Sequence, residues 1–182
     1  DNLPIDDELT YKLYQEGRTI GTFQFESAGM QKYLKELRPT VFEDLIAMNA
    51  LYRPGPMDYI PSFIARKNGL EEIKYDIPIM EKYLKDTYGI TVYQEQVMQV
   101  LQALAGYSFG RADVVRRAMA KKKHDVMNQE KKNFIYGLEE NGVVTVPGAV
   151  RNGVSEDLVI GLACLDDCVS RHIGASCTAY HL

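Results

Sequence analysis

The chain has 182 residues and a mass of 20.6 kDa, with 46% hydrophobic and 25% charged residues, a composition that argues against wholesale disorder. Its formal net charge of -4 excludes a general attraction of the whole chain to nucleic acid. The charge is nevertheless uneven, because residues 111–132 carry eight Lys or Arg against three Asp or Glu. This basic block within an acidic chain predicts a local anion site.

No apolar run reaches the roughly 20 residues that are needed to span a bilayer, and the first residues lack a signal-peptide pattern. The three cysteines lie between Cys164 and Cys177 and do not make a disulfide framework. We therefore expect no membrane partner and a reducing, cytoplasmic environment. The start at Asp1, without a Met, indicates a fragment of a longer chain.

The dominant hydrophobic period is that of an α-helix, and stop signals fall between the periodic segments. We expect seven or eight helices with at most one or two short strands, which is a mainly α fold. Asp6 or Asp7 can cap a first helix that extends through Glu16. Leu9 and Leu13 form its expected inward face.

Residues 19–25 alternate loosely and contain β-branched and aromatic side chains, so they predict a short strand. Ser27 then caps a helix whose apolar residues are Met30, Tyr33, Leu34 and Leu37. Thr40 and Glu43 predict a capping box for the next helix, which must end before Pro54. The expected inward face of that helix consists of Phe42, Leu45, Ile46 and Ala50.

Three further helices are expected in the middle of the chain. The first begins near Ile60 and ends at Gly69, and the second opens at Pro78. The third begins near Tyr93 and is closed by Gly106. Its inward face consists of Val97, Val100, Leu101 and Leu104.

The last part of the chain predicts a basic helix from about Gly110 and another helix from about Asp125 to just before Gly142. Residues 143–150 contain Val-Val-Thr-Val-Pro-Gly, which predicts an extended stretch that turns at Pro147 and Gly148. Ser155 can cap a last helix that has acidic residues in its first turn.

The expected basic helix carries two adjacent arginines, Arg116 and Arg117, which point about 100° apart. Lys121 is a helical neighbour of Arg117, and Lys122 and Lys123 follow. The buried side of the helix is expected to consist of Val115 and Met119. Guanidinium groups bind phosphate bidentately and ammonium groups add point charge, so the display suits a polyanion. A solvated basic face is the alternative, and the charge pattern alone leaves both open.

Three other polar residues are candidates for a supporting role. Arg53 precedes a Pro-Gly-Pro loop, where it can serve a ligand or face the dipole of the preceding helix. Gln94 and Glu95 stand where a loop enters a helix. A carboxylate there could orient a neighbouring arginine, but first-turn acids are also common for dipole reasons.

Three segments are specific enough to indicate a family: residues 21–30, residues 50–57 and residues 88–123. With the intervening chain they contain the strings FQFES-GM, FEDLIA, L-RPGP, TYGI-VYQEQVM, AGYS and RRAM-KKK. In order and spacing, these strings resemble the C-family replicative polymerases, the alpha subunits of bacterial DNA polymerase III. The resemblance covers residues 1–157, and it implies the helical fingers region of a DNA-directed DNA polymerase.

The resemblance further implies that Arg116 and Arg117 approach the triphosphate of the incoming dNTP, with Lys121, Lys122 and Lys123 nearby. Chemistry in that family is two-metal phosphoryl transfer, in which palm carboxylates hold Mg²⁺. Primer–template DNA, the sliding clamp and other replisome subunits are the implied partners, the latter two through regions outside this chain. The alternative is a non-catalytic module that binds the phosphate backbone of nucleic acid.

After Asp157 the resemblance ends, and residues 158–182 read as an atypical C-terminal tail. Cys164, Cys168 and His172 fall at i, i+4 and i+8, which raises the possibility of zinc. On one helix these ligands would spread over about 12 Å and could not meet at one ion. We therefore expect no metal site there, and a frayed tail from about Cys168 onward.

We predict that the purified 182-residue chain does not extend a primer at any Mg²⁺ concentration. The sequence contains no Asp-x-Asp pair, and the palm carboxylates of the family would precede Asp1. A primer-extension assay with the isolated chain tests this, and robust extension would contradict it.

Overall fold

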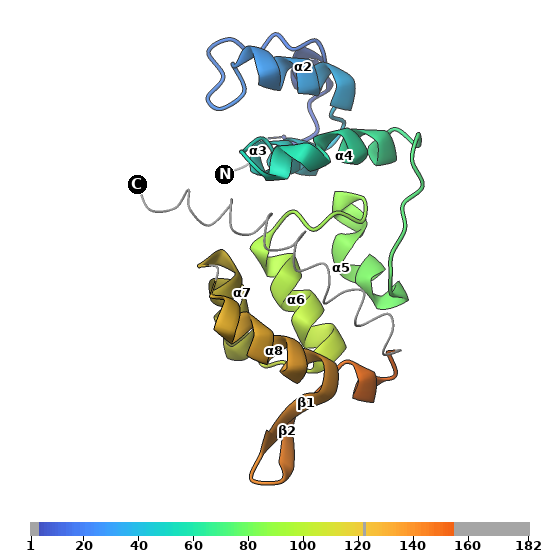
Figure 1. Ribbon diagram of the computed structural model, residues 1–182. Helices are drawn as coiled ribbons and strands as arrows, with labels where there is room; N and C mark the ends of the chain where they lie inside the picture. Colours follow the sequence, from blue (N-terminus) through green and yellow to red (C-terminus); the bar gives the residue numbers. More distant parts are fainter. Residues whose placement is uncertain (1–3, 122, 155–182) are drawn as a thin grey trace. The chain divides into compact units, whose positions relative to one another are not determined.

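The structure, a computed structural model, describes residues 4–121 and 123–154. These residues fold mainly into α-helices with one two-stranded antiparallel sheet, which confirms the expected fold class (Figure 1). They form two compact units, of which the first contains residues 4–73 and 86–90 and the second contains residues 74–85 and 91–154. Each unit has a buried core of its own.

The first unit is built from four α-helices and a short 3₁₀ helix. They are α1 (Glu8–Gln15), α2 (Ala28–Leu37), α3 (Phe42–Leu51), η1 (Pro56–Tyr59) and α4 (Ile60–Lys67). Two predicted caps are confirmed, since Asp7 accepts from the backbone N–H of Thr10 and Ser27 accepts from that of Met30. The largest fully buried side chains of this unit are Met30, Leu34, Leu37, Met48, Leu51, Ile60 and Phe63.

Two local expectations for this unit are wrong. Residues 19–25 form consecutive turns instead of a strand, and Gln24 has a positive φ of 66°, which no strand tolerates. The buried Thr19 hydroxyl donates to the carbonyl of Phe25 at 2.6 Å and closes this loop on itself. On α1, Leu9 is 78% exposed, and Tyr11 is the buried residue of the helix.

The capping of α3 also differs from the expectation. The backbone N–H groups of Thr40 and Val41 donate to Asp44 Oδ2 at 2.9 and 3.4 Å, so Asp44 takes the part expected of Glu43. The helix consequently begins one residue later than a Thr40 cap would place it, and its inward face shifts. Phe42 and Ile46 are exposed, and the buried residues of α3 are Asp44, Leu45, Ala47, Met48 and Leu51.

Asp44 is a buried carboxylate, 2% exposed, that joins distant parts of the first unit. Besides the two backbone groups, it accepts from the Tyr88 hydroxyl at 3.0 Å and lies 3.5 Å from the Lys67 ammonium. Burial, and then the charge of Asp44, raises the pKa of the Tyr88 hydroxyl, which therefore stays a donor. A carboxylate so buried is tolerated because both of its oxygens have partners.

The second unit contains the other helices and the sheet. Its elements are η2 (Pro78–Met80), α5 (Glu81–Leu84), α6 (Gln94–Ala105), α7 (Phe109–Ala120), α8 (His124–Tyr136), β1 (Gly137–Glu140), β2 (Val143–Pro147) and η4 (Val150–Asn152), with η3 (Lys85–Thr87) leading back to the first unit. The core shared by α6 and α7 consists of Val97, Met98, Leu101, Ala105, Tyr107, Ala112 and Val115.

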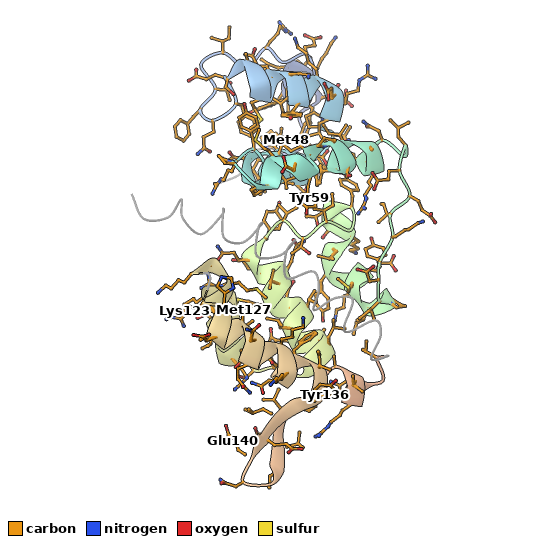
Figure 2. All side chains as sticks on the ribbon, viewed as in Figure 1. Met48, Tyr59, Lys123, Met127, Tyr136 and Glu140 are labelled. Carbon is orange, nitrogen blue, oxygen red and sulfur yellow. The ribbon has the colours of Figure 1, made fainter. Side chains whose placement is uncertain are left out.

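The sequence predicts a helix up to Gly142, but α8 ends at Tyr136 and a β-hairpin follows. Figure 2 labels Tyr136 at the end of α8 and Glu140 on the hairpin. Gly137 has a φ of 96°, and a Cβ there would lie 2.6 Å from the carbonyl oxygen of Val146, so the helix stops at a residue that must be glycine. Asn141 and Gly142 both have positive φ, as a two-residue hairpin turn requires.

We predict that Asp44→Ala lowers the free energy of unfolding by about 3–5 kcal/mol, because Lys67 and Tyr88 lose a buried partner. Urea unfolding followed by circular dichroism measures the loss. The exposed neighbour Glu43 provides the control, and Glu43→Ala should change stability by no more than about 0.5 kcal/mol. Equal, small losses in the two variants would contradict the structural role of Asp44.

Candidate functional site

The basic helix expected near Gly110 is α7, and small apolar residues hold it in the second unit. Ser108 caps it by accepting from the backbone N–H of Arg111 at 3.3 Å. Its buried residues are Ala112, Val115 and Ala118, and Met119 packs partly buried against the same core. The expected buried side, Val115 and Met119, is therefore confirmed. Of the arginines of α7, Arg117 is exposed, whereas Arg111 and Arg116 are half-buried.

Arg116 is fixed in place by two partners on different helices. Its Nε and Nη2 donate to Asp113 Oδ1 at 2.9 and 2.6 Å, and its Nη1 donates to Gln94 Oε1 at 2.6 Å. Gln94 is the first residue of α6, so this guanidinium links the start of α6 to the middle of α7. The Arg116 side chain is 20% exposed.

Arg117 has a different environment from its neighbour. Its Nη2 forms an ion pair with Asp113 Oδ2, and its side chain is 59% exposed. The pKa of the Asp113 carboxyl lies below its ordinary value of 3.8, because Arg116 donates to it and both arginines place positive charge beside it. One ionised carboxylate thus serves two guanidinium groups, one of which remains largely accessible to solvent.

The lysines that follow extend the basic surface. Lys121 ends α7, with its backbone N–H bonded to the carbonyl of Arg117 at 3.1 Å, and its side chain is exposed. Lys123 is exposed at the start of α8, where Figure 2 labels it. Lys122 lies outside the described residues. Arg116 and Arg117 thus share Asp113 on α7, whereas Lys121 follows the last residue of that helix and Lys123 precedes α8.

Of the supporting candidates, only Gln94 contacts one of these arginines by a described bond. Glu95 is exposed in the first turn of α6, where a carboxylate suits the helix dipole. Arg53 belongs to the first unit, is half-buried and follows the end of α3. Its carbonyl accepts from the backbone N–H of Met57 at 3.1 Å, which closes the Pro-Gly-Pro loop.

Two carboxylates of the site were not singled out from the sequence. Asp113 could have been found, because its spacing to Arg116 and Arg117 is i+3 and i+4. Glu130 could not, because it lies 19 residues from the Arg111 that donates to it at 2.7 Å. Glu130 also accepts from the Tyr107 hydroxyl at 3.2 Å. The ion pair between Arg111 and Glu130 therefore joins the start of α7 to α8.

Among the described residues, no three His, Cys, Asp or Glu side chains are grouped so that they could hold a metal ion. The cysteines and histidine considered for zinc, Cys164, Cys168 and His172, lie outside the described residues, as does the expected last helix after Ser155. No helix in the described part of the chain is long and apolar enough to cross a membrane.

We predict a pH-dependent contribution of Asp113 to stability. Because its folded-state pKa is lowered, the carboxylate stabilises the fold above the unfolded-state pKa, and this contribution is lost as pH falls through the folded-state value. The wild-type chain should therefore melt at a higher temperature than Asp113→Asn above about pH 5, and the difference should vanish in acid. A difference that persists unchanged in acid would contradict the ion-pair account.

Comparison with known proteins identifies the family of the chain. Residues 1–142 match the family model for the bacterial DNA polymerase III alpha subunit finger domain. The DNA polymerase III subunit alpha of Chlamydia pneumoniae is 59% identical over 141 residues, which are 78% of this chain and 11% of that protein. The subunits of Borreliella burgdorferi and Aquifex aeolicus are 53% and 51% identical over 141 and 142 residues, 78% and 77% of this chain and 12% of each protein. The chain belongs to the finger domain family of the bacterial DNA polymerase III alpha subunit.

Proposed function

We propose that this chain is the fingers part of a DNA-directed DNA polymerase and that α7 positions the triphosphate of the incoming dNTP. The observation that carries the proposal is the pair of adjacent arginines, Arg116 and Arg117, held by Asp113 on a helix that is anchored in a core. The matched segment covers 11–12% of the length of the relatives, and we propose polymerisation for the complete subunit and not for this segment alone.

A triphosphate concentrates several negative charges within a few ångströms, and phosphoryl transfer adds charge at the bridging and terminal oxygens. Cations that are already oriented stabilise that charge without reorganising during the reaction. Arg117 is suited to contact the triphosphate because its side chain is 59% exposed, and Arg116, which is held by Asp113 and Gln94, places a fixed positive charge beside it. The exposed Lys121 and Lys123 add unspecific attraction, and Lys122 is proposed to do the same.

Gln94 fits a positioning role, since it accepts from Arg116. Arg53 and Glu95 are proposed as supporting residues on their sequence context alone. In the complete enzyme we propose that Mg²⁺ accompanies the dNTP and is held by carboxylates outside this chain. From the same family membership we propose primer–template DNA and the sliding clamp as partners of the complete enzyme. We also propose that the enzyme is cytoplasmic.

In a full-length alpha subunit that contains this sequence, Arg117→Ala should lower kcat/KM for the dNTP by about 10²-fold or more, the loss typical of an oriented charge-stabilising donor. The affinity for primer–template DNA should change by less than about twofold, because many cations share the binding of an extended phosphate backbone and each contributes little. Steady-state kinetics and fluorescence anisotropy measure the two quantities.

Lys132 provides a matched control, because Lys132→Ala removes one positive charge from the same basic block at an exposed position of α8. Its kcat/KM should stay within about twofold of wild type. If Arg117→Ala weakened DNA binding and left the nucleotide kinetics intact, α7 would instead be a phosphate-backbone binding module.

A further inference from the structure

Asp113 divides its two oxygens between two arginines that differ in how firmly they are held. Oδ1 accepts from Nε and Nη2 of Arg116, and Oδ2 pairs with Nη2 of Arg117. Arg116 is additionally bound to Gln94 on α6 and is 20% exposed, whereas Arg117 is 59% exposed. The same carboxylate is therefore part of a fixed cluster on one side and of an accessible ion pair on the other.

The accessible pair is the easier one to break. An ion pair open to solvent changes an equilibrium by only about two- to fivefold, because water screens the charges and the long side chain loses conformational freedom. Separating Arg116 from Asp113 would break two hydrogen bonds in a less exposed place. An incoming polyanion that carries more charge than one carboxylate can thus take Arg117 and leave the rest of the cluster intact.

We propose that Asp113 is a positioning residue that pairs with Arg117 while no triphosphate is bound. When a triphosphate binds, Arg117 leaves Asp113 and pairs with the triphosphate, and Arg116 stays bound to Asp113 and Gln94. The inference rests on the proposed function of α7. It assigns different parts to the two adjacent arginines: Arg117 exchanges one anion for another, and Arg116 keeps the carboxylate and the start of α6 in place. The lowered pKa of Asp113 keeps its carboxyl ionised at neutral pH, as the exchange requires.

The exchange predicts a distinctive split of kinetic effects in the full-length subunit. Asp113→Asn removes the charge that competes for Arg117, so KM for the dNTP should fall by about two- to fivefold. Asn can still accept a hydrogen bond from Arg116, so kcat should fall less in Asp113→Asn than in Asp113→Ala. A carboxylate that merely supported the fold would raise KM, or leave it unchanged, in both variants.

Asp125 supplies the matched control for charge. It is exposed in the first turn of α8, and Asp125→Asn changes the net charge of the basic block by the same amount as Asp113→Asn. The KM of Asp125→Asn should equal that of wild type. An equal fall of KM in the two Asn variants would overturn the inference, because net charge alone would then explain the effect.

A double variant and a binding measurement complete the test. In the double variant Arg117→Ala with Asp113→Asn, KM should equal that of Arg117→Ala alone. Without Arg117, the carboxylate of Asp113 and the triphosphate no longer compete for the same guanidinium. Equilibrium binding of inorganic tripolyphosphate, measured by calorimetry, should tighten in Asp113→Asn and does not depend on turnover. Unchanged binding of tripolyphosphate to an Asp113→Asn variant that still unfolds in one cooperative transition would overturn the inference. If Arg117→Ala did not affect the nucleotide kinetics, the proposed function and the inference would both be wrong. If Arg117→Ala did affect them and Asp113→Asn did not lower KM, only the inference would be wrong.

Discussion

The pairing of arginines with carboxylates is the constraint on which the candidate site depends. The block 111–132 carries a net positive charge, and like charges on neighbouring helical turns repel one another. Asp113 offsets this repulsion on α7 by pairing with Arg116 and Arg117, and Glu130 on α8 does so by pairing with Arg111. Without these two carboxylates the arginine side chains would be free to turn toward solvent. The helix α7 would then still carry positive charge, but its guanidinium groups would have no fixed orientation.

Packing determines where this charge points. Ala112 and Ala118 are buried on α7, and Ala112 belongs to the core that α7 shares with α6, where its small side chain allows close packing of the two helices. Close approach brings Gln94, at the start of α6, within 2.6 Å of the Arg116 guanidinium. Larger residues at the two alanines would move α7 outward and separate these partners. The orientation of Arg116 is therefore a consequence of core packing as much as of hydrogen bonding.

The helices were predictable where local rules determine them, as at Asp7 and Ser27, whose caps act over three residues. Prediction failed where distant partners decide the structure. Asp44 replaces Glu43 in the cap because it can also reach Tyr88, 44 residues away. The same holds for the site, since the contacts of Asp113 follow from helical spacing, whereas the Gln94–Arg116 bond spans 22 residues. The Asn-Gly turn after β1 is a local hairpin signal, although the helical period of the preceding residues predicts a helix up to Gly142.

The structure also changes what the charge of the basic block means for binding. Counting Lys and Arg treats all of them as equivalent, but the described partners divide them. Arg111 is committed to Glu130 and stacks over the ring of Tyr107 at 5.4 Å, with its Nε buried. An arginine held in this way contributes to the junction of α7 and α8 and little to an incoming anion. Arg117, Lys121, Lys123 and Lys132 are exposed, so the accessible charge of the described block lies at the end of α7 and on α8. The described partners of each side chain, and not the number of Lys and Arg alone, therefore determine which cations of the block are open to an anion.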